Sequence, residues 1–244
     1  IPILKTLNPS LSTTVQENVE RFAGSETNLS FLLEKERLNI VLQKGTEQHF
    51  ILSALTAYPS PSSVLYYFIS DFGFHDWKAI ENMLNSESGK IIYSQTHELL
   101  KDREVLVLRE KKTVDHRRYL IEKSKSCISS PLQMQFSCVP AKDFKINTSS
   151  LVAALDYDKL IFPLELRKWK EGDVFQPLGL KGKKKLSDFF IDQKKNIFEK
   201  ENTWLLCSDD QIVWVVGSRI DERFKLVEKT QKVYLAELND VFGK

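Results

Sequence analysis

The stretch that decides the fold of the C-terminal half is Thr203–Gly217, TWLLCSDDQIVWVVG. Aromatic and β-branched residues, which concentrate in β-strands, lie on both sides of the acidic dipeptide Asp209-Asp210. A two-residue acidic turn between two such runs is typical of a β-hairpin. The sequence therefore predicts two antiparallel strands that meet at Asp209-Asp210.

Further strands are predicted on both sides of this hairpin. The segments are LVAALDYDKL (151–160), FPLELRKWKEGD (162–173) and KVYLAEL (232–238). A short helix is expected at about Leu186 to Asp192. The polar segment NTSS, Asn147 to Ser150, is turn-like and predicts a domain boundary near residue 150.

The N-terminal part carries helical spacing instead. Asn8-Pro9 is a good helix start, and apolar residues then recur at helical intervals from Leu11 to about Leu42. Only Gly24-Ser25 interrupts this pattern, so the sequence predicts one long helix or two with a kink. Three shorter helices are expected at 49–58, 62–72 and 76–84, before the NSESG segment (85–89) ends the helical region.

The period then changes to that of strands. KIIYSQT (90–96) and REVLVLREKK (103–112) predict a hairpin with HELLKDR (97–103) at its turn, and CISSPLQMQFSCV (127–139) adds one or two strands. We therefore expect an α+β fold with a helical domain at 1–89, a mixed β adjunct at 90–150 and a compact α/β domain at 151–244.

Composition limits the function classes. The 244 residues carry a net charge of only +2, so nucleic-acid binding would depend on local patches. Three cysteines, Cys127, Cys138 and Cys207, predict a reducing cytoplasm rather than a disulfide framework. The four histidines are too scattered for a structural zinc site. No signal peptide or membrane-spanning run is recognisable, and the opening IPIL predicts a piece of a longer protein.

Catalytic motifs are missing from the sequence. Neither a Walker A motif nor GxGxxG occurs, and the GxxG at Gly179–Gly182 is a weak signal by itself. Asp188 and Asp192 could share a helix face and bind a metal, but the neighbouring lysines favour simple charge neutralisation. Cys207 lies in an apolar strand, where a buried inert thiol is expected. We expect this chain alone to be non-catalytic, with no cofactor of its own.

The most basic segment follows Gly179. Seven lysines and three acids lie between Lys181 and Lys200. Glycines that relax the backbone, mobile lysine charges and a helix N-terminus together favour phosphate binding. The alternative is a solvated basic turn, and the residues alone leave both interpretations open.

Two smaller basic groups accompany it. One contains Arg219, Arg223, Lys225 and Lys229, and the other contains His116, Arg117, Arg118 and Lys123. Tyr119 and Phe224 beside them could stack on unpaired bases, although half-buried strand residues are the more common case.

One long string of residues resembles a known family. GDVFQPLGLKGKKKLSDFFIDQK from Gly172, followed by QIVWVVGSRIDERFK from Gln211, resembles the C-terminal domain of bacterial tRNA(Ile)-lysidine synthetases. The opening IPILKTLNPSL also resembles the segment that follows the catalytic domain of that family and leads into its long connecting helix. The resemblance spans both ends of the chain, while residues 90–150 carry few diagnostic positions.

The resemblance implies the tRNA-recognition portion of a ligase that uses ATP to attach lysine to the wobble cytidine of tRNA(Ile). The SGGxDS loop of the family's N-terminal PP-loop domain is missing from this sequence, so ATP with Mg²⁺ and lysine would be substrates of that missing domain. Implied partners are tRNA(Ile), the N-terminal domain and a homodimer partner, without a membrane. The residues that we expect to bind tRNA are Lys181, Lys183, Lys184, Lys185, Lys194, Lys195, Arg219, Arg223, Arg117 and Arg118. Asp188, Phe189 and Trp214 are expected to serve the fold.

Two other functions compete with this interpretation. The chain could be a free-standing RNA-binding or adaptor module that shares the terminal fold. It could also be a protein–protein scaffold that uses its helical half, which would require an exposed apolar patch on the helices.

Overall fold

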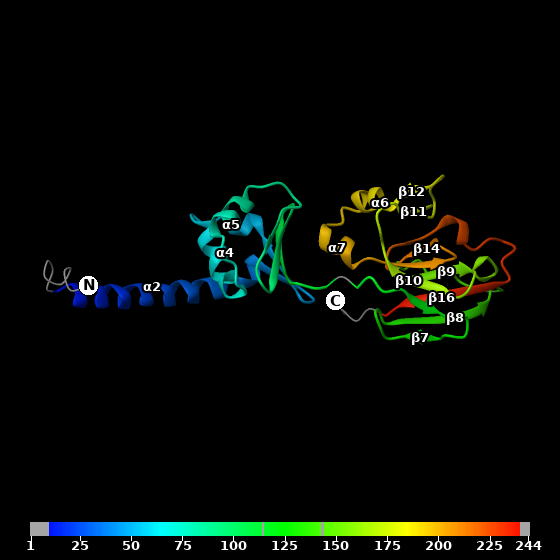
Figure 1. Cartoon of the computed structure of the whole chain (residues 1–244), viewed down its shortest axis with the longest axis horizontal. Coiled ribbons are helices and arrows are strands. Elements are labelled where there is room, and N and C mark those ends of the chain that lie inside the picture. Colours follow the sequence, from blue (N-terminus) through cyan, green and yellow to red (C-terminus); the bar gives the residue numbers. More distant parts are fainter. Residues whose placement is uncertain (1–9, 114, 143, 240–244) are drawn as a thin grey trace. The chain divides into compact units, whose positions relative to one another are not determined.

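The computed structural model describes residues 10–113, 115–142 and 144–239, and the chain forms two compact units (Figure 1). Unit 1 is Ile1–Lys112 and unit 2 is Thr113–Lys244. Helices and antiparallel sheets occur in both units, which confirms the predicted α+β class. No helix of the described residues is long and apolar enough to cross a membrane.

Unit 1 begins with one long helix, α2 (Leu11–Ile40), which continues through Gly24-Ser25 without a break. The predicted start at Asn8-Pro9 lies outside the described residues. Within unit 1, the first half of α2 extends beyond the other elements, whereas Leu33 and Ile40 near its C-terminal end are buried (Figure 1).

The other helices of unit 1 pack on one sheet. They are α3 (Leu52–Thr56), α4 (Pro61–Ile69), the 3₁₀ turn η1 (Ser70–Phe72) and α5 (Trp77–Leu84). The sheet has the order β1-β2-β5-β4-β3, with strands β1 (Val41–Lys44), β2 (Glu47–Ile51), β3 (Ile91–Tyr93), β4 (His97–Asp102) and β5 (Val105–Glu110). A single apolar core joins them, with Phe50, Leu55 and Leu65 inaccessible to solvent.

Two expectations for unit 1 are wrong. The predicted helix at 49–58 begins only at Leu52, because residues 47–51 form β2 and pair with the distant strand β5. Long-range pairing here overrides local spacing. The segment HELLKDR is not a turn: it forms β4, whose Leu99 and Leu100 are buried, and the turn lies at Arg103-Glu104.

Unit 2 contains two sheets and a small hairpin. The first sheet has the order β15-β14-β13-β10-β6, with β6 (Tyr119–Ile121), β10 (Leu164–Lys168), β13 (Trp204–Ser208), β14 (Gln211–Val215) and β15 (Arg219–Ile220). The second has the order β7-β8-β16-β9, with β7 (Cys127–Ile128), β8 (Met134–Pro140), β9 (Val152–Asp156) and β16 (Lys232–Leu238). The remaining elements are η2 (Tyr157–Lys159), the hairpin β11 (Val174–Phe175) and β12 (Lys184–Lys185), α6 (Leu186–Asp192), α7 (Ile197–Asn202) and η3 (Glu222–Phe224).

The predicted hairpin at Thr203–Gly217 lies at the centre of unit 2. β13 and β14 pair antiparallel, and Asp209 and Asp210 both have positive φ, as a tight hairpin turn requires. One face of their sheet packs against the second sheet, and the other packs against β11 and α6. All of β13 is therefore buried, which explains why WLLCS lacks the alternation of a half-exposed strand.

The domain boundaries also differ from those expected. The β adjunct at 90–150 is not a separate body, because β3–β5 complete the sheet of unit 1 while β6–β8 complete the two sheets of unit 2. The division falls between Lys112 and Thr113 instead of near 89 and 150. Strand pairing assigns each part of the adjunct to a neighbour with which it shares a core.

Candidate nucleic-acid interface

The lysine loop, residues 176–183, joins β11 to β12. The two short strands pair through Val174 with Lys185 and Phe175 with Lys184. Gly179 and Gly182 have φ of +85° and +97°. Glycine adopts this conformation without the steric cost that other residues incur, so the two glycines shape the loop.

Hydrogen bonds from Gln176 and Gly179 connect the lysine loop to the segment around Asp221. The Asp221 carboxylate, which is fully buried, accepts a hydrogen bond from the Gln176 backbone N–H at 2.8 Å. The Glu222 N–H donates to the Gln176 carbonyl at 2.7 Å, and the Gly179 N–H donates to the Glu222 side chain at 2.9 Å. These three hydrogen bonds to Asp221 and Glu222 hold the lysine loop in a defined position.

A buried ion pair holds the start of this hairpin. Arg167 on β10 donates two hydrogen bonds to Asp173, at 2.8 and 2.9 Å, with both side chains less than a tenth exposed. Burial opposes the charge of Arg167, but the hydrogen bonds to Asp173 and the negative charges around the guanidinium together outweigh it and raise the pKa of Arg167. The Lys170 N–H also donates to Asp173 at 2.8 Å.

Helix α6 supports the other end of the loop. Leu186, Phe189 and Phe190 are buried against Phe175 and the outer face of the first sheet. Asp188 lies in the first turn of α6, where its negative charge interacts favourably with the positive end of the helix dipole. Phe189 and Trp214 are 3% and 1% exposed, as expected of residues that serve the fold.

The residues considered for catalysis do not form a reactive site. Asp192 pairs with Lys184, as the neutralisation hypothesis predicts. Within the described residues, no group of three or more His, Cys, Asp or Glu side chains could hold a metal. Burial raises the pKa of the Cys207 thiol to about 12, so this cysteine is an inert core residue.

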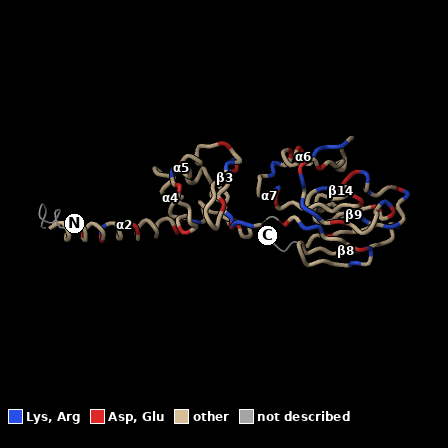
Figure 2. The backbone as a smooth tube through the Cα atoms, in the orientation of Figure 1, with Lys and Arg blue, Asp and Glu red and all other residues tan. Residues whose placement is uncertain are grey.

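The lysines of this region differ in what they touch. Lys181, Lys183 and Lys185 are exposed and make no ion pair with any described residue, and Figure 2 shows the loop beside α6 in blue. Lys184, by contrast, pairs with Asp192. Lys195 is half-buried, donates to Thr203 Oγ1 at 3.2 Å and lies over the Phe190 ring, and this burial lowers its pKa. Lys194 is exposed in a left-handed conformation.

The two arginines of the second basic group also differ in whether they bind another protein group. Arg219 is exposed and lines a hollow of about 590 Å³ together with Leu178 of the lysine loop. Arg223 is instead bound to Asp221 through its backbone N–H and two guanidinium nitrogens, at 2.8–2.9 Å. The charge of Arg223 thus stabilises the anchor of the loop, while Arg219 remains open to a ligand.

In the third basic group, Arg117 and Arg118 also pair with carboxylates of the protein. Arg117 donates to Asp115, and its hydrogen bonds, followed by that of Tyr119, hold the pKa of the Asp115 carboxyl well below its usual range. Arg118 lies 3.5 Å from Glu165. Tyr119 packs on Trp204 with ring centroids 5.8 Å apart. Tyr119 is therefore a half-buried strand residue, as the alternative interpretation predicts.

The sequence pattern alone does not identify Asp221 as the residue on which the lysine loop depends. An Asp whose side chain accepts from the N–H two residues later forms an Asx-turn, and RIDERF contains this signal at Asp221 and Arg223. The Arg167–Asp173 pair was also missed, since six residues of sequence give no indication that two strand ends will bring the side chains together.

Two family models match parts of this chain. Residues 43–111 match the model of the TilS substrate binding domain, and residues 164–237 match that of the TilS substrate C-terminal domain. A tRNA(Ile)-lysidine synthase of Parabacteroides distasonis is 41% identical over 238 residues, 96% of this chain and 54% of the relative. That of Bacteroides thetaiotaomicron is 29% identical over 240 residues, 98% of this chain and 53% of the relative.

The chain spans about half the length of these curated relatives. Among solved structures, a crystal structure of the TilS C-terminal domain aligns with 50% of this chain and 95% of its own, with a TM-score of 0.42 and 18% identity.

Proposed function

Because this chain belongs to the tRNA(Ile)-lysidine synthase family and corresponds to a C-terminal portion of its members, we propose that it is the tRNA-recognition portion of such a ligase. The whole protein would attach lysine to the wobble cytidine of tRNA(Ile) in the cytoplasm. ATP with Mg²⁺ and lysine would bind its N-terminal PP-loop domain, and this chain would contribute no catalytic residue.

One observation carries the proposal at the level of residues. Lys181 and Lys183 project from the lysine loop, which Asp221 fixes in place, and Lys185 projects from β12 directly after it. None of the three has a carboxylate partner among the described residues. Charges that the protein leaves unneutralised on an anchored loop are suited to phosphate oxygens. Lysine acts there as a point charge, which suits contacts to the backbone of an RNA rather than to its bases.

We propose that only some of the ten residues expected to bind tRNA contact it. Arg219 is exposed and lines a hollow with Leu178 of the lysine loop, so we add it to the three lysines, whereas Lys194 interacts with another group and is left out. Lys184, Lys195, Arg223, Arg117 and Arg118 all contact protein groups, so we assign them to support. The proposed contact surface is therefore Lys181, Lys183, Lys185 and Arg219.

Titration of labelled tRNA(Ile) at several salt concentrations tests this surface. The variant K181A/K183A/K185A should lose about tenfold or more in affinity at low salt. The slope of log K against log salt should fall by about 2 to 3, since each lost phosphate contact removes about 0.7 to 0.9. All tRNAs should be affected alike, because phosphate contacts carry no sequence information.

A matched control removes the same charge elsewhere. K125A/K142A/K145A deletes three exposed lysines outside the lysine loop, and its affinity and slope should stay near those of the unmodified chain. Equal losses in the two variants would mean that only net charge matters. Unchanged binding in the loop variant would show that the lysine loop is a solvated turn.

A further inference from the structure

The hollow that Leu178 and Arg219 line is formed by segments far apart in sequence. It has a volume of about 590 Å³, which is in the range of pockets that hold small ligands. The segments that form it are residues 146–150, β9, Leu178 of the lysine loop, Trp214 of β14, residues 218–220 and Lys225-Leu226. Part of its lining therefore belongs to the loop that carries the proposed phosphate contacts.

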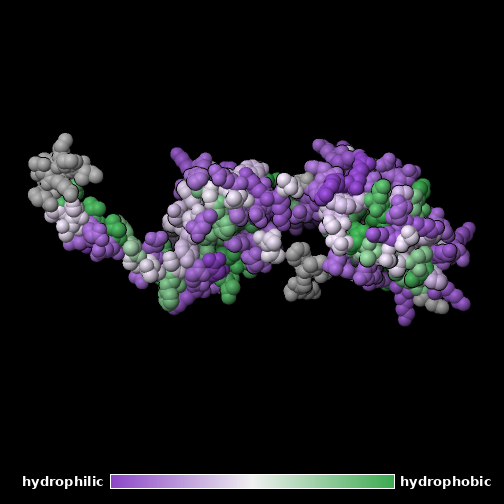
Figure 3. Space-filling model, turned by 60° about the horizontal axis from the view of Figure 1, so that its bottom comes forward, coloured by the Kyte–Doolittle hydropathy of each residue, from purple (hydrophilic) through white to green (hydrophobic). Residues whose placement is uncertain are grey.

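The lining of the hollow contains apolar groups that remain open to solvent. Ala154 and Trp214 are buried, whereas Leu178 and Ile146 are 39% and 67% exposed. On the side of unit 2 that Figure 3 shows, apolar groups in green gather between hydrophilic ones in purple. An apolar lining with a few polar groups is typical of a binding pocket, and it favours a ligand that has an apolar face.

Polar groups without protein partners accompany this apolar surface. The hydroxyls of Thr148, Ser150 and Ser218 form no hydrogen bond with any described residue, and the exposed Arg219 guanidinium forms no ion pair with one. Lys225, the other cation of the lining, pairs with Glu222. None of the described residues that line the hollow is an aspartate or a glutamate. The hollow can therefore offer hydrogen bonds and a positive charge to an anion without repelling it.

Hydrogen bonds hold the walls of the hollow without occupying these groups. The Leu178 N–H donates to the Ile220 carbonyl at 3.0 Å, which connects the lysine loop to β15. In the segment before β9, the Ser149 N–H donates to the Asn147 side chain at 2.9 Å, and the Leu151 N–H donates to Ser149 Oγ at 3.2 Å. Walls that are already ordered lose less conformational entropy when a ligand enters.

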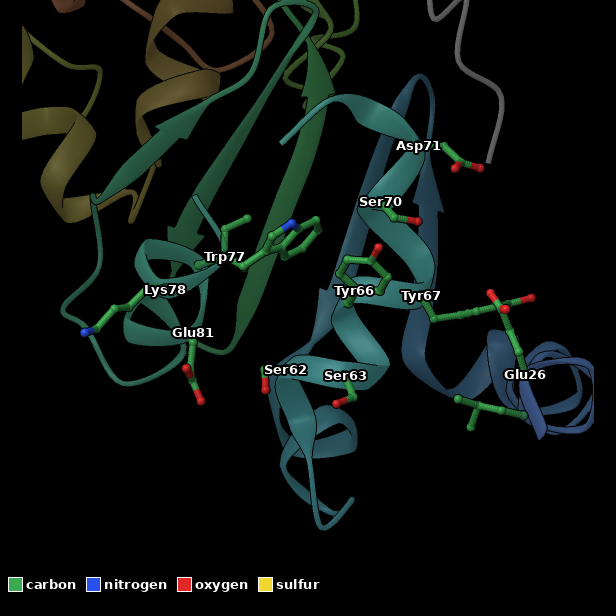
Figure 4. A pocket seen from close by; sticks show the side chains of 12 residues that line it. Glu26, Ser62, Ser63, Tyr66, Tyr67, Ser70, Asp71, Trp77, Lys78 and Glu81 are labelled. Carbon is green, nitrogen blue, oxygen red and sulfur yellow. The ribbon is translucent and has the colours of Figure 1, made fainter. Parts of the chain in front are cut away.

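A groove of unit 1 has the opposite charge. It has a volume of about 720 Å³, and its described lining residues include Glu26, Asp71 and Glu81 but only one cation, Lys78 (Figure 4). A phosphate in that groove would meet three carboxylates, whereas a phosphate at the hollow of unit 2 would meet the guanidinium of Arg219. Of these two cavities, the hollow of unit 2 is the one that suits an anionic ligand.

We propose that this hollow takes one unpaired nucleotide of the RNA strand whose phosphates lie on the lysine loop. The base would pack on Leu178 and Ile220, the hydroxyls of the hollow would bond to its polar edge, and Arg219 would pair with its phosphate. A paired base keeps both faces stacked inside its helix, so only an unpaired one can enter. The inference rests on the proposed function, because it requires RNA on the lysine loop.

Anisotropy titrations with two labelled hairpin RNAs test the inference. Both RNAs carry a single-stranded tail with the same number of phosphates, but the tail of the second RNA is abasic. The chain should bind the RNA with a complete tail about fivefold or more tightly, as expected when one unpaired base packs on the protein. Saturable binding of a free nucleoside monophosphate at micromolar concentration, lost in L178A, would make the free nucleotide the ligand and refute the RNA source.

Variants of the hollow locate the base. L178A removes part of its apolar lining and S150W fills its space, so each should abolish the preference for the complete tail. L180A is the matched control, since Leu180 is 46% exposed on the same loop but does not line the hollow. The preference should persist in L180A.

The outcomes separate this inference from the proposed function. Equal binding of the two RNAs, with both weakened by K181A/K183A/K185A, would refute the hollow while the phosphate contacts stand. A preference that survives in L178A and S150W, or that L180A abolishes equally, would place the base elsewhere and also refute the hollow. Failure of both RNAs to bind would refute the proposed function, and the inference with it.

Discussion

Two sets of basic side chains lie close together on the hairpin region of unit 2 and have opposite surroundings. Lys181, Lys183 and Lys185 are exposed and have no carboxylate partner among the described residues. Arg167 and Arg223 are each bound by two nitrogens to a buried carboxylate, Asp173 and Asp221. Lys181 and Lys183 lie on the lysine loop and Lys185 lies on β12 beside it, whereas each arginine binds a carboxylate that holds one end of the hairpin region.

The difference follows from the chemistry of the two residue types. A guanidinium is planar and matches a carboxylate through two parallel hydrogen bonds, so arginine can fix a geometry inside the protein. An ammonium is a compact, strongly hydrated charge on a flexible stem, so lysine is easily left at the surface for a ligand. Basic residues near a candidate interface therefore include some that stabilise the protein and some that are free to bind a ligand. The hydrogen-bond and ion-pair partners of each side chain show to which kind it belongs.

The largest expected effect comes from breaking the support. Asp173→Asn removes the carboxylate that binds the buried Arg167 guanidinium through two hydrogen bonds and leaves only Glu165, at 3.8 Å, as a counter-charge among the described residues. Loss of one partner of a buried pair costs about 3 kcal/mol. Urea unfolding of unit 2, followed by tryptophan fluorescence, measures this loss. The control Asp192→Asn removes the exposed partner of Lys184 and should change stability by less than about 0.5 kcal/mol. Equal costs for the two substitutions would remove the distinction between buried and exposed pairs.

The second prediction is that loss of Asp221, which supports the lysine loop, also weakens tRNA binding. Asp221→Asn removes the charge that accepts from Arg223 and from the Gln176 N–H, and should cost about 2 kcal/mol, the value of a charged hydrogen bond. Because the lysine loop loses its anchor, tRNA affinity should fall several-fold although no lysine has been changed. Amide exchange at Gln176 reports the anchor, and anisotropy with labelled tRNA reports the affinity. Faster exchange with unchanged affinity would show that the lysines work without a fixed loop.

Local signals were sufficient for much of unit 2. The Asp209-Asp210 turn with its two apolar runs predicted β13 and β14, and the spacing after Lys185 predicted α6 with its observed bounds. Both elements are decided by neighbours in sequence. The basic character of this region was also visible as composition, since residues 179–185 contain two glycines and four lysines.

Long-range contacts were out of reach. Residues 49–51 were expected to begin a helix but belong to β2, because β5, some sixty residues away in sequence, pairs with them. The strands of 90–150 were placed in one adjunct, because no local feature shows that a strand completes a sheet elsewhere. For the same reason, the sequence could count Lys195, Arg117 and Arg223 as basic but could not identify the groups that hold them.

Alanine substitutions at Gly182 and Gly24 should change the free energy of unfolding in opposite directions, which tests the conformation of the lysine loop. Gly182 has φ of +97°, so Gly182→Ala is strained and should destabilise unit 2 by about 1 kcal/mol. Gly24 lies inside α2 with open space around it, so Gly24→Ala should stabilise that helix by about 0.5 to 1 kcal/mol. Thermal unfolding of each variant gives the sign. Stabilisation by Gly182→Ala would mean that the lysine loop does not hold the left-handed conformation.

The smallest effect concerns a paired arginine on the surface of unit 1. Arg37 donates two hydrogen bonds to Glu34, and with that of Tyr67 they lower the pKa of Glu34 from 4.5 to about 2. A lowered pKa in the folded state stabilises unit 1 above pH 4.5, and this contribution is lost as the pH falls from 4.5 towards 2. Because Glu34 is 46% exposed, screening by solvent limits the contribution to about 0.5 kcal/mol.

Unfolding of unit 1 between pH 6 and pH 2 measures this term, and Glu34→Gln should reduce the dependence on pH in that range. The neighbouring Glu36→Gln is the control, because the Glu36 side chain accepts only from Asn39 and meets no cation among the described residues. If Glu34→Gln and Glu36→Gln gave the same pH profile, an arginine paired at the surface would stabilise no more than an unpaired charge. The division between support and contact would then hold only for the buried arginines, Arg167 and Arg223.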